Sequence, residues 1–138
     1  MQTPGGNNPG VCTNILFFTS TDFIMAKLPE EILTRVFSIQ RQLLERINEA
    51  TEIEYQLLEE FGETEETLIY FEQVQNSRER ADSYYLRLFT ALQQIYPAQP
   101  VASRDSLELL ARFIGEAQAS VDAVGATLAE IKRDFDLR

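Results

Sequence analysis

The feature that most constrains this fold is an unbroken run of apolar residues, alternately three and four positions apart, near the C-terminus. Its members are Leu107, Leu110, Ile114, Ala117, Val121, Val124, Leu128, Ile131 and Phe135. This spacing keeps every member on one side of an α-helix, and a seven-residue repeat makes neighbouring helices supercoil with a left hand. The run therefore predicts a long helix over about residues 104–136 that packs lengthwise against other helices.

Two more helices of this kind are predicted upstream, over about residues 29–61 and 64–96. The apolar face of the first is Ile32, Val36, Ile39, Leu43, Ile47, Ala50, Leu57 and Phe61. The face of the second is Tyr70, Val74, Ala81, Tyr85, Leu88, Leu92 and Ile95. Each helix would be about 50 Å long at 1.5 Å per residue. Three near-equal helices with short connections predict an all-α, up-down-up bundle of antiparallel helices over residues 28–138.

Local signals agree with these helix ends. Pro29 suits a first helical position, and Gly62 suits the end of the first helix. Thr64 is a candidate N-cap for the second helix, and Asp105 with Glu108 is a candidate capping box for the third. Between the last two helices, the two prolines of "YPAQP" prevent the helix from continuing.

Residues 1–27 are predicted to form a non-helical N-terminal leader, because "TPGGNNPG" does not sustain a helix or a strand. Its apolar run, from Ile15 to Met25, is shorter than the roughly 20 residues that cross a bilayer. One interpretation is a flexible tail, or an extension of a chain whose working part starts at Met25. The other is a tail that docks on the bundle or on a neighbouring chain. Its docking residues would be Ile15, Leu16, Phe17, Phe18 and Phe23.

Composition argues against catalysis and against several classes of ligand. The chain has no histidine, which is the commonest general base near neutral pH and the commonest transition-metal ligand. We therefore expect no enzyme, no catalytic residues, no metal site and no cofactor. The net charge of −10 disfavours nucleic acid. The single cysteine, Cys12, fits a cytoplasmic protein.

Two charged residues interrupt the apolar faces. Glu54 stands between Ala50 and Leu57, and Arg78 stands in the corresponding gap of the second helix. They would either reach water at the edge of the bundle or fix the register of the helices. A direct bond between them is not expected, because helix rise alone sets Arg78 about 10 Å further along the rod. A third interpretation is a ligand site formed by Arg78 with Tyr84 and Tyr85.

Two further faces are candidate contact surfaces. On the first helix, a second apolar stripe of Leu33, Phe37, Leu44 and Tyr55 is expected to be buried against a partner or the leader. On the third helix, Gly115, Ala119, Ala123 and Ala126 would let another helix come close, or are there only because alanine favours helices. The leading hypothesis is a non-enzymatic protein–protein interaction module, such as an adaptor, scaffold or regulatory bundle, that self-associates or docks on a protein partner. The alternative is a binder of a small ligand or pigment near Arg78.

Overall fold

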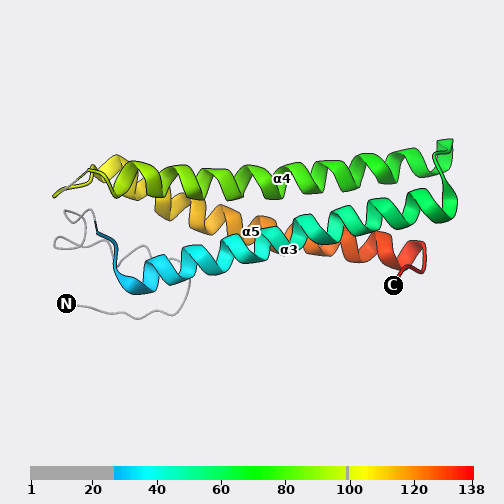
Figure 1. The fold of residues 1–138 in the computed structure, drawn as a ribbon, viewed down its shortest axis with the longest axis horizontal. Coiled ribbons are helices and arrows are strands. Elements are labelled where there is room, and N and C mark those ends of the chain that lie inside the picture. Colours follow the sequence, from blue (N-terminus) through cyan, green and yellow to red (C-terminus); the bar gives the residue numbers. More distant parts are fainter. Residues whose placement is uncertain (1–26, 99) are drawn as a thin grey trace.

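The structure is a computed structural model that describes residues 27–98 and 100–138. Within these ranges the chain forms three α-helices and no strand: α3 spans Glu30–Phe61, α4 spans Glu65–Ile95 and α5 spans Arg104–Asp134. The helices lie side by side along one rod, and the chain reverses direction between each pair (Figure 1). The predicted three-helix, up-down-up bundle is confirmed. The predicted leader of residues 1–27 lies outside the described residues, except for Lys27.

Both ends of α3 follow from local chemistry. Pro29 is the N-cap of this helix rather than the first helical residue that the sequence had suggested. Glu30 and Glu31 place negative charge in the first turn, where the helix dipole favours it. At the other end Gly62 has a φ of 69°, and its N–H reaches the carbonyls of Leu57 and Leu58 at 3.1 Å. Glycine takes this left-handed conformation without steric cost, so the predicted end of the helix is confirmed.

A reciprocal cap starts α4. The Thr64 hydroxyl accepts the Thr67 N–H at 3.2 Å, and the Thr67 hydroxyl oxygen accepts the Thr64 N–H at 2.9 Å. Thr67 also lies within hydrogen-bonding distance of the Gly62 carbonyl, at 2.9 Å, and its side chain is buried. The sequence identified Thr64 but not Thr67, because capping boxes usually carry Glu or Gln at that position.

The predicted capping box of Asp105 and Glu108 is wrong. Ser103 is the N-cap of α5, and its hydroxyl accepts the Ser106 N–H at 3.1 Å. The helix begins at Arg104, so Asp105 is already inside the first turn, where its charge still favours the positive end of the dipole.

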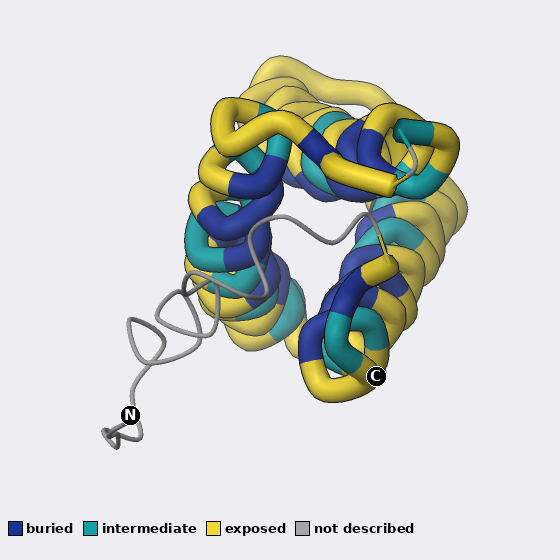
Figure 2. The backbone as a smooth tube through the Cα atoms, turned by 90° about the vertical axis from the view of Figure 1, so that its left-hand side faces the viewer, coloured by how far each residue is buried: buried dark blue, intermediate teal, exposed yellow. Residues whose placement is uncertain are grey.

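The buried residues form two clusters along the rod, and they face inward when the bundle is seen from its end (Figure 2). The cluster nearer the α4–α5 connection is Leu28, Ile32, Val36, Ile39, Leu43, Ala81, Leu88, Ala91, Ile95, Ala102, Leu107, Leu110, Ala111, Ile114, Ala117 and Val121. The cluster nearer the α3–α4 turn is Ala50, Ile53, Leu57, Val74, Val124, Leu128 and Ile131. Each fully buried Leu or Ile stabilises the fold by about 1.5–3 kcal/mol, so these seams hold the helices together.

The predicted face of α5 is confirmed, since every member from Leu107 to Ile131 is buried. Phe135, the last member, is only partly buried and closes the end of the second cluster. Its ring meets those of Phe61 and Tyr70 edge to face, with centroids 5.0 and 4.7 Å apart. Such pairs contribute about 0.5–1.5 kcal/mol beyond the area that they bury.

Candidate functional site

The second apolar stripe of α3 is largely exposed. Phe37, Leu44 and Tyr55 have exposed fractions of 55%, 50% and 64%, while Leu33 is half-buried. The described residues of one molecule therefore do not bury this stripe. The predicted docking residues of the leader, Ile15 to Phe23, lie outside the described residues.

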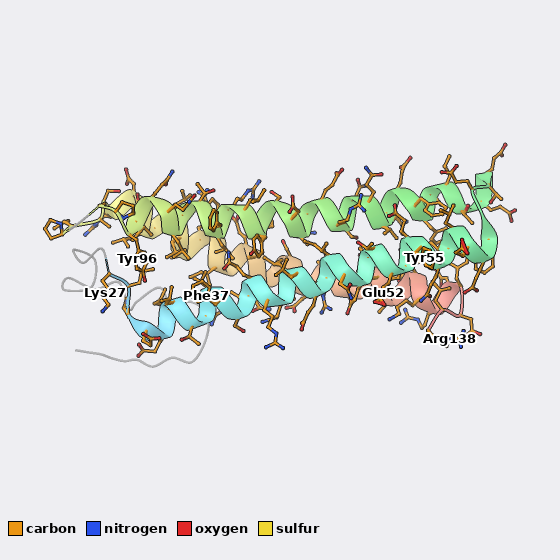
Figure 3. The ribbon with its side chains drawn as sticks, in the orientation of Figure 1. Lys27, Phe37, Glu52, Tyr55, Tyr96 and Arg138 are labelled. Carbon is orange, nitrogen blue, oxygen red and sulfur yellow. The ribbon has the colours of Figure 1, made fainter. Side chains whose placement is uncertain are left out.

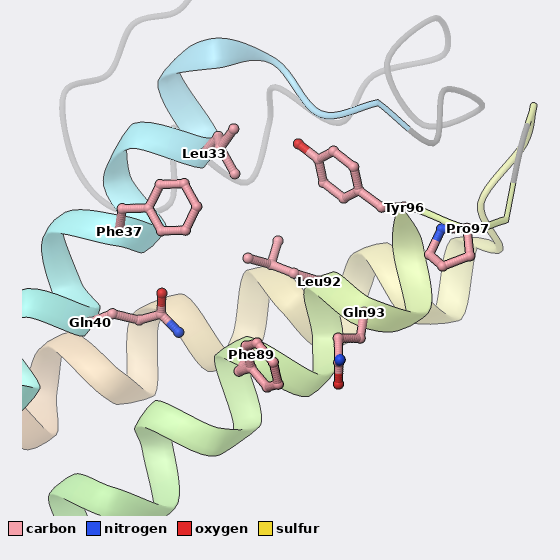
Figure 4. A pocket seen from close by; sticks show the side chains of 8 residues that line it. All are labelled: Leu33, Phe37, Gln40, Phe89, Leu92, Gln93, Tyr96 and Pro97. Carbon is pink, nitrogen blue, oxygen red and sulfur yellow. The ribbon is translucent and has the colours of Figure 1, made fainter.

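One end of the stripe lines an open groove between α3 and α4. The groove has a volume of about 460 Å³ and is lined by Leu33, Phe37, Gln40, Phe89, Leu92, Gln93, Tyr96 and Pro97. Leu33 and Phe37 come from α3 and face Leu92 and Tyr96 of α4 across the space (Figure 4). The lining is mostly apolar, which suits a hydrophobic side chain of a partner.

Gln40 is the one buried side chain among the residues that line this groove. Its side chain is 8% exposed, and its amide nitrogen lies 3.5 Å from the carbonyl oxygen of Tyr85 on α4. Gln40 and Tyr85 thus mark a place where α3 and α4 are in contact, and the predicted stripe of α3 lies beside it on the solvent side. Phe37 is at one end of α3 and Tyr55 is nearer the other, so the exposed stripe extends along much of the rod (Figure 3).

Glu54 and Arg78 do not occupy the buried seam positions where the apolar spacing placed them. Both side chains are about a third exposed, which agrees with the interpretation that they reach water at the edge of the bundle. Ile53, 2% exposed, takes the seam position on α3, and Ser77, 8% exposed, takes it on α4. Spacings of three and four are equally compatible with one helix face, so the seam can take either the third or the fourth residue. The helix packing selects Ile53 and the small Ser77 and leaves both charges at the edge.

The expectation that Glu54 and Arg78 do not bond directly is also wrong. Arg78 Nη1 donates to Glu54 Oε1 at 3.3 Å, and the two side chains are 37% and 34% exposed. Side chains lean toward the N-terminus of their own helix, so in an antiparallel pair these two lean toward each other. This lean and the length of the arginine side chain together span the axial offset between the backbones of Glu54 and Arg78.

Arg78, Tyr84 and Tyr85 do not come together in one site. The Tyr84 hydroxyl donates to Glu116 of α5 at 3.3 Å, and the Arg87 guanidinium covers its ring at 4.7 Å. Tyr85 belongs to the α3 side of α4, as the contact of its carbonyl with Gln40 shows. The ligand-binding alternative therefore gains no support from these contacts and stays a prediction.

The small-residue face of α5 remains at the surface. Ala119, Ala123 and Ala126 are exposed and Gly115 is half-buried. A different glycine, Gly125, is where α5 admits a close neighbour: a Cβ built there would lie 2.7 Å from Nη2 of Arg46. Arg46 Nε donates to the Val121 carbonyl at 2.9 Å, one turn before Gly125.

Sequence reasoning also missed three exposed apolar residues beside the stripe: Leu58, Leu68 and Phe89 are 50%, 53% and 47% exposed. Leu58 lies two heptads after Leu44 and so continues the stripe of α3. The seven-residue repeat could therefore have predicted it from the sequence. Leu68 and Phe89 of α4 could be assigned only once the side of α4 that faces α3 was known.

Among residues 27–98 and 100–138, no three His, Cys, Asp or Glu side chains are placed to hold a metal ion together. None of the helices in these ranges combines the length and the apolar character needed to cross a membrane. Comparison with protein families, with curated proteins and with solved structures finds no match to this chain.

Proposed function

We propose that this protein is a non-enzymatic protein–protein interaction module whose docking face is the exposed stripe of α3 and the adjoining α3–α4 groove. One observation carries the proposal: Phe37, Leu44, Tyr55 and Leu58 are large apolar side chains, each half or more exposed, on one side of one helix. Isolated exposed apolar residues are ordinary, whereas a run that shares one side of a helix marks a contact surface.

The face combines two properties that favour docking. The groove end offers a recess for a side chain, bounded by Phe37 and Phe89. The rest of the stripe offers a long, regular helix surface against which another helix can pack. The buried seams behind it already order the backbone of α3, so docking does not have to fold this helix.

Composition supports the non-enzymatic part of the proposal. The chain has no histidine, and its net charge of −10 opposes binding to phosphate backbones. A cytoplasmic location, expected from the single Cys12, belongs to the same proposal. The small-ligand alternative has less support, because Arg78 is paired with Glu54 and Tyr84 with Glu116.

The test is site-specific photo-crosslinking in the cells that make the protein. A photoreactive amino acid replaces Phe37 in one variant and Arg112 in the other; Arg112 is a matched control on α5, with 63% of its side chain exposed. We expect crosslinked species from position 37 and none of comparable yield from position 112. Equal yields from both positions, or no product at position 37, would refute the docking face.

A further inference from the structure

The outer surface of α3 carries a second seven-residue repeat, separate from the buried one. Its positions alternate three and four apart without a break, and all of them are exposed: Thr34, Phe37, Arg41, Leu44, Asn48, Thr51, Tyr55 and Leu58. We call this set the outer seam. One helix presents such a repeat to another in a coiled coil.

The chemistry of the outer seam is that of a specific helix pair. Four of its members are large and apolar, with exposed fractions between 50% and 64%. Arg41, Asn48 and Thr51 interrupt them. A polar residue in a helix–helix seam selects the register and orientation of the partner. The outer seam therefore favours one alignment of the partner helix over non-specific apolar association.

We propose that a second copy of this chain occupies the outer seam, with the two α3 helices antiparallel about a twofold axis near Arg46. This inference rests on the proposed docking face and identifies its partner. Two of the four apolar residues lie on each side of Arg46, and Phe37 and Tyr55 are equally distant from it, so each can meet the other across a twofold axis. The alignment sets Phe37 opposite Tyr55 of the second copy, and Leu44 opposite Asn48 of the second copy.

Charge favours the antiparallel orientation over the parallel one. In a parallel pair, Arg41 would stack on Arg41 of the second copy. In the antiparallel pair it faces Thr51 of the second copy and reaches Glu52, the next residue, which is also exposed. Glu45, the acidic residue nearest the axis, is partly neutralised by its ion pair with Arg41 of its own chain at 3.7 Å.

The exposed residues of α4 fit the same alignment. Leu68 and Phe89 are three heptads apart, so they share one side of α4, and Phe89 lines the groove with Phe37. Leu68 is near the opposite end of the helix, in its first turn. An antiparallel pair brings Leu68 of each copy toward Phe89 of the other, which would cover both ends of the face.

The first measurement is the mass of the purified full-length chain by sedimentation equilibrium, at about 0.15 M ionic strength so that the net negative charge is screened beyond about 8 Å. We expect twice the mass of one chain, and the mass of a single chain for Leu44→Glu. Ala123→Glu is the matched control, since Ala123 is exposed on α5, and it should leave the doubled mass unchanged. A single-chain mass for the unaltered protein would overturn the proposal.

The second measurement tests the orientation by disulfide trapping in a Cys12→Ser background. A mixture of Phe37→Cys and Tyr55→Cys chains should form a disulfide-linked dimer of the two variants. Phe37→Cys alone should not, because the antiparallel register separates its two copies by about 27 Å along the axis, at 1.5 Å per residue. Efficient trapping of Phe37→Cys with itself would overturn the antiparallel arrangement.

The two proposals fail in different ways. A single-chain mass combined with crosslinking of position 37 to another protein would overturn the second copy and leave the docking face standing. A single-chain mass with no crosslinked product would overturn both. Far-UV circular dichroism of each variant must match that of the unaltered chain, which we expect because every substituted side chain of the seam is half or more exposed.

Discussion

Replacing Gly125 with alanine should make the bundle less stable, although alanine is the better helix former. A side chain at this position leans back over the carbonyl of Val121, where Arg46 Nε now donates at 2.9 Å. The added Cβ would lie 2.7–2.8 Å from the Arg46 guanidinium, so that group must leave. Because it is the end of a flexible side chain, the cost is the lost hydrogen bond rather than a steric clash.

The magnitude follows from two opposing terms. Exchanging glycine for alanine inside a helix contributes about 1 kcal/mol of stability. Losing a hydrogen bond from a charged donor costs about 1.5–3 kcal/mol. The lower end of this energy range applies here, because the Arg46 side chain is 27% exposed and the displaced guanidinium can hydrogen-bond to water. Gly125→Ala should therefore lower the free energy of unfolding by about 0.5 kcal/mol.

The assay is a double-mutant cycle, with urea unfolding followed by circular dichroism at one protein concentration, since self-association would add to stability. In an Arg46→Ala background, Gly125→Ala should instead stabilise by about 1 kcal/mol, giving a coupling of about 1.5 kcal/mol. Ala123→Gly, at an exposed site, calibrates the glycine penalty in α5. Equal stabilisation by Gly125→Ala in both backgrounds would refute the reasoning.

Substitutions at four positions test three other contacts. Alanine at Glu54, Arg78 or both should reveal a coupling of about 0.2–1 kcal/mol that weakens with salt, because both side chains are about a third exposed; a coupling insensitive to salt would contradict this. Thr67→Val should lower the free energy of unfolding by about 1–2 kcal/mol more than Thr90→Val, an exposed control, because only Thr67 caps a helix. An equal cost at both positions would rule out the capping role. Phe135→Leu removes two edge-to-face ring pairs, so it should lose about 1–3 kcal/mol beyond its lost area and reduce the near-UV circular dichroism signal. An unchanged signal would contradict the ring packing.

The candidate face was only partly predictable. The stripe that begins at Leu33 and Phe37 was evident, because a second apolar row beside a buried one exceeds what the core needs. The groove was not, because its other wall comes from Phe89 and Tyr96 of α4. The sequence alone does not predict which side of α4 faces α3.

The sequence by itself determined the class of fold, the number of helices in the body and most of the residues that each helix buries, although Phe61, predicted on the buried face of α3, is 43% exposed. These properties depend on spacing within one helix, where each residue rotates the chain by a constant angle, so the apolar face can be read without knowing its neighbours. The helix ends at Gly62 and Thr64 were equally local, since a cap involves only residues within a few positions.

Only the tertiary structure decided which polar side chains meet across the helices. It selected Ile53 for the seam in place of Glu54, joined Glu54 to Arg78, and laid Arg46 against Gly125. Such contacts depend on the axial level of one helix against another and on the lean and length of each side chain. A small axial shift or a one-residue choice in the seam changes these partners while leaving the apolar repeat intact.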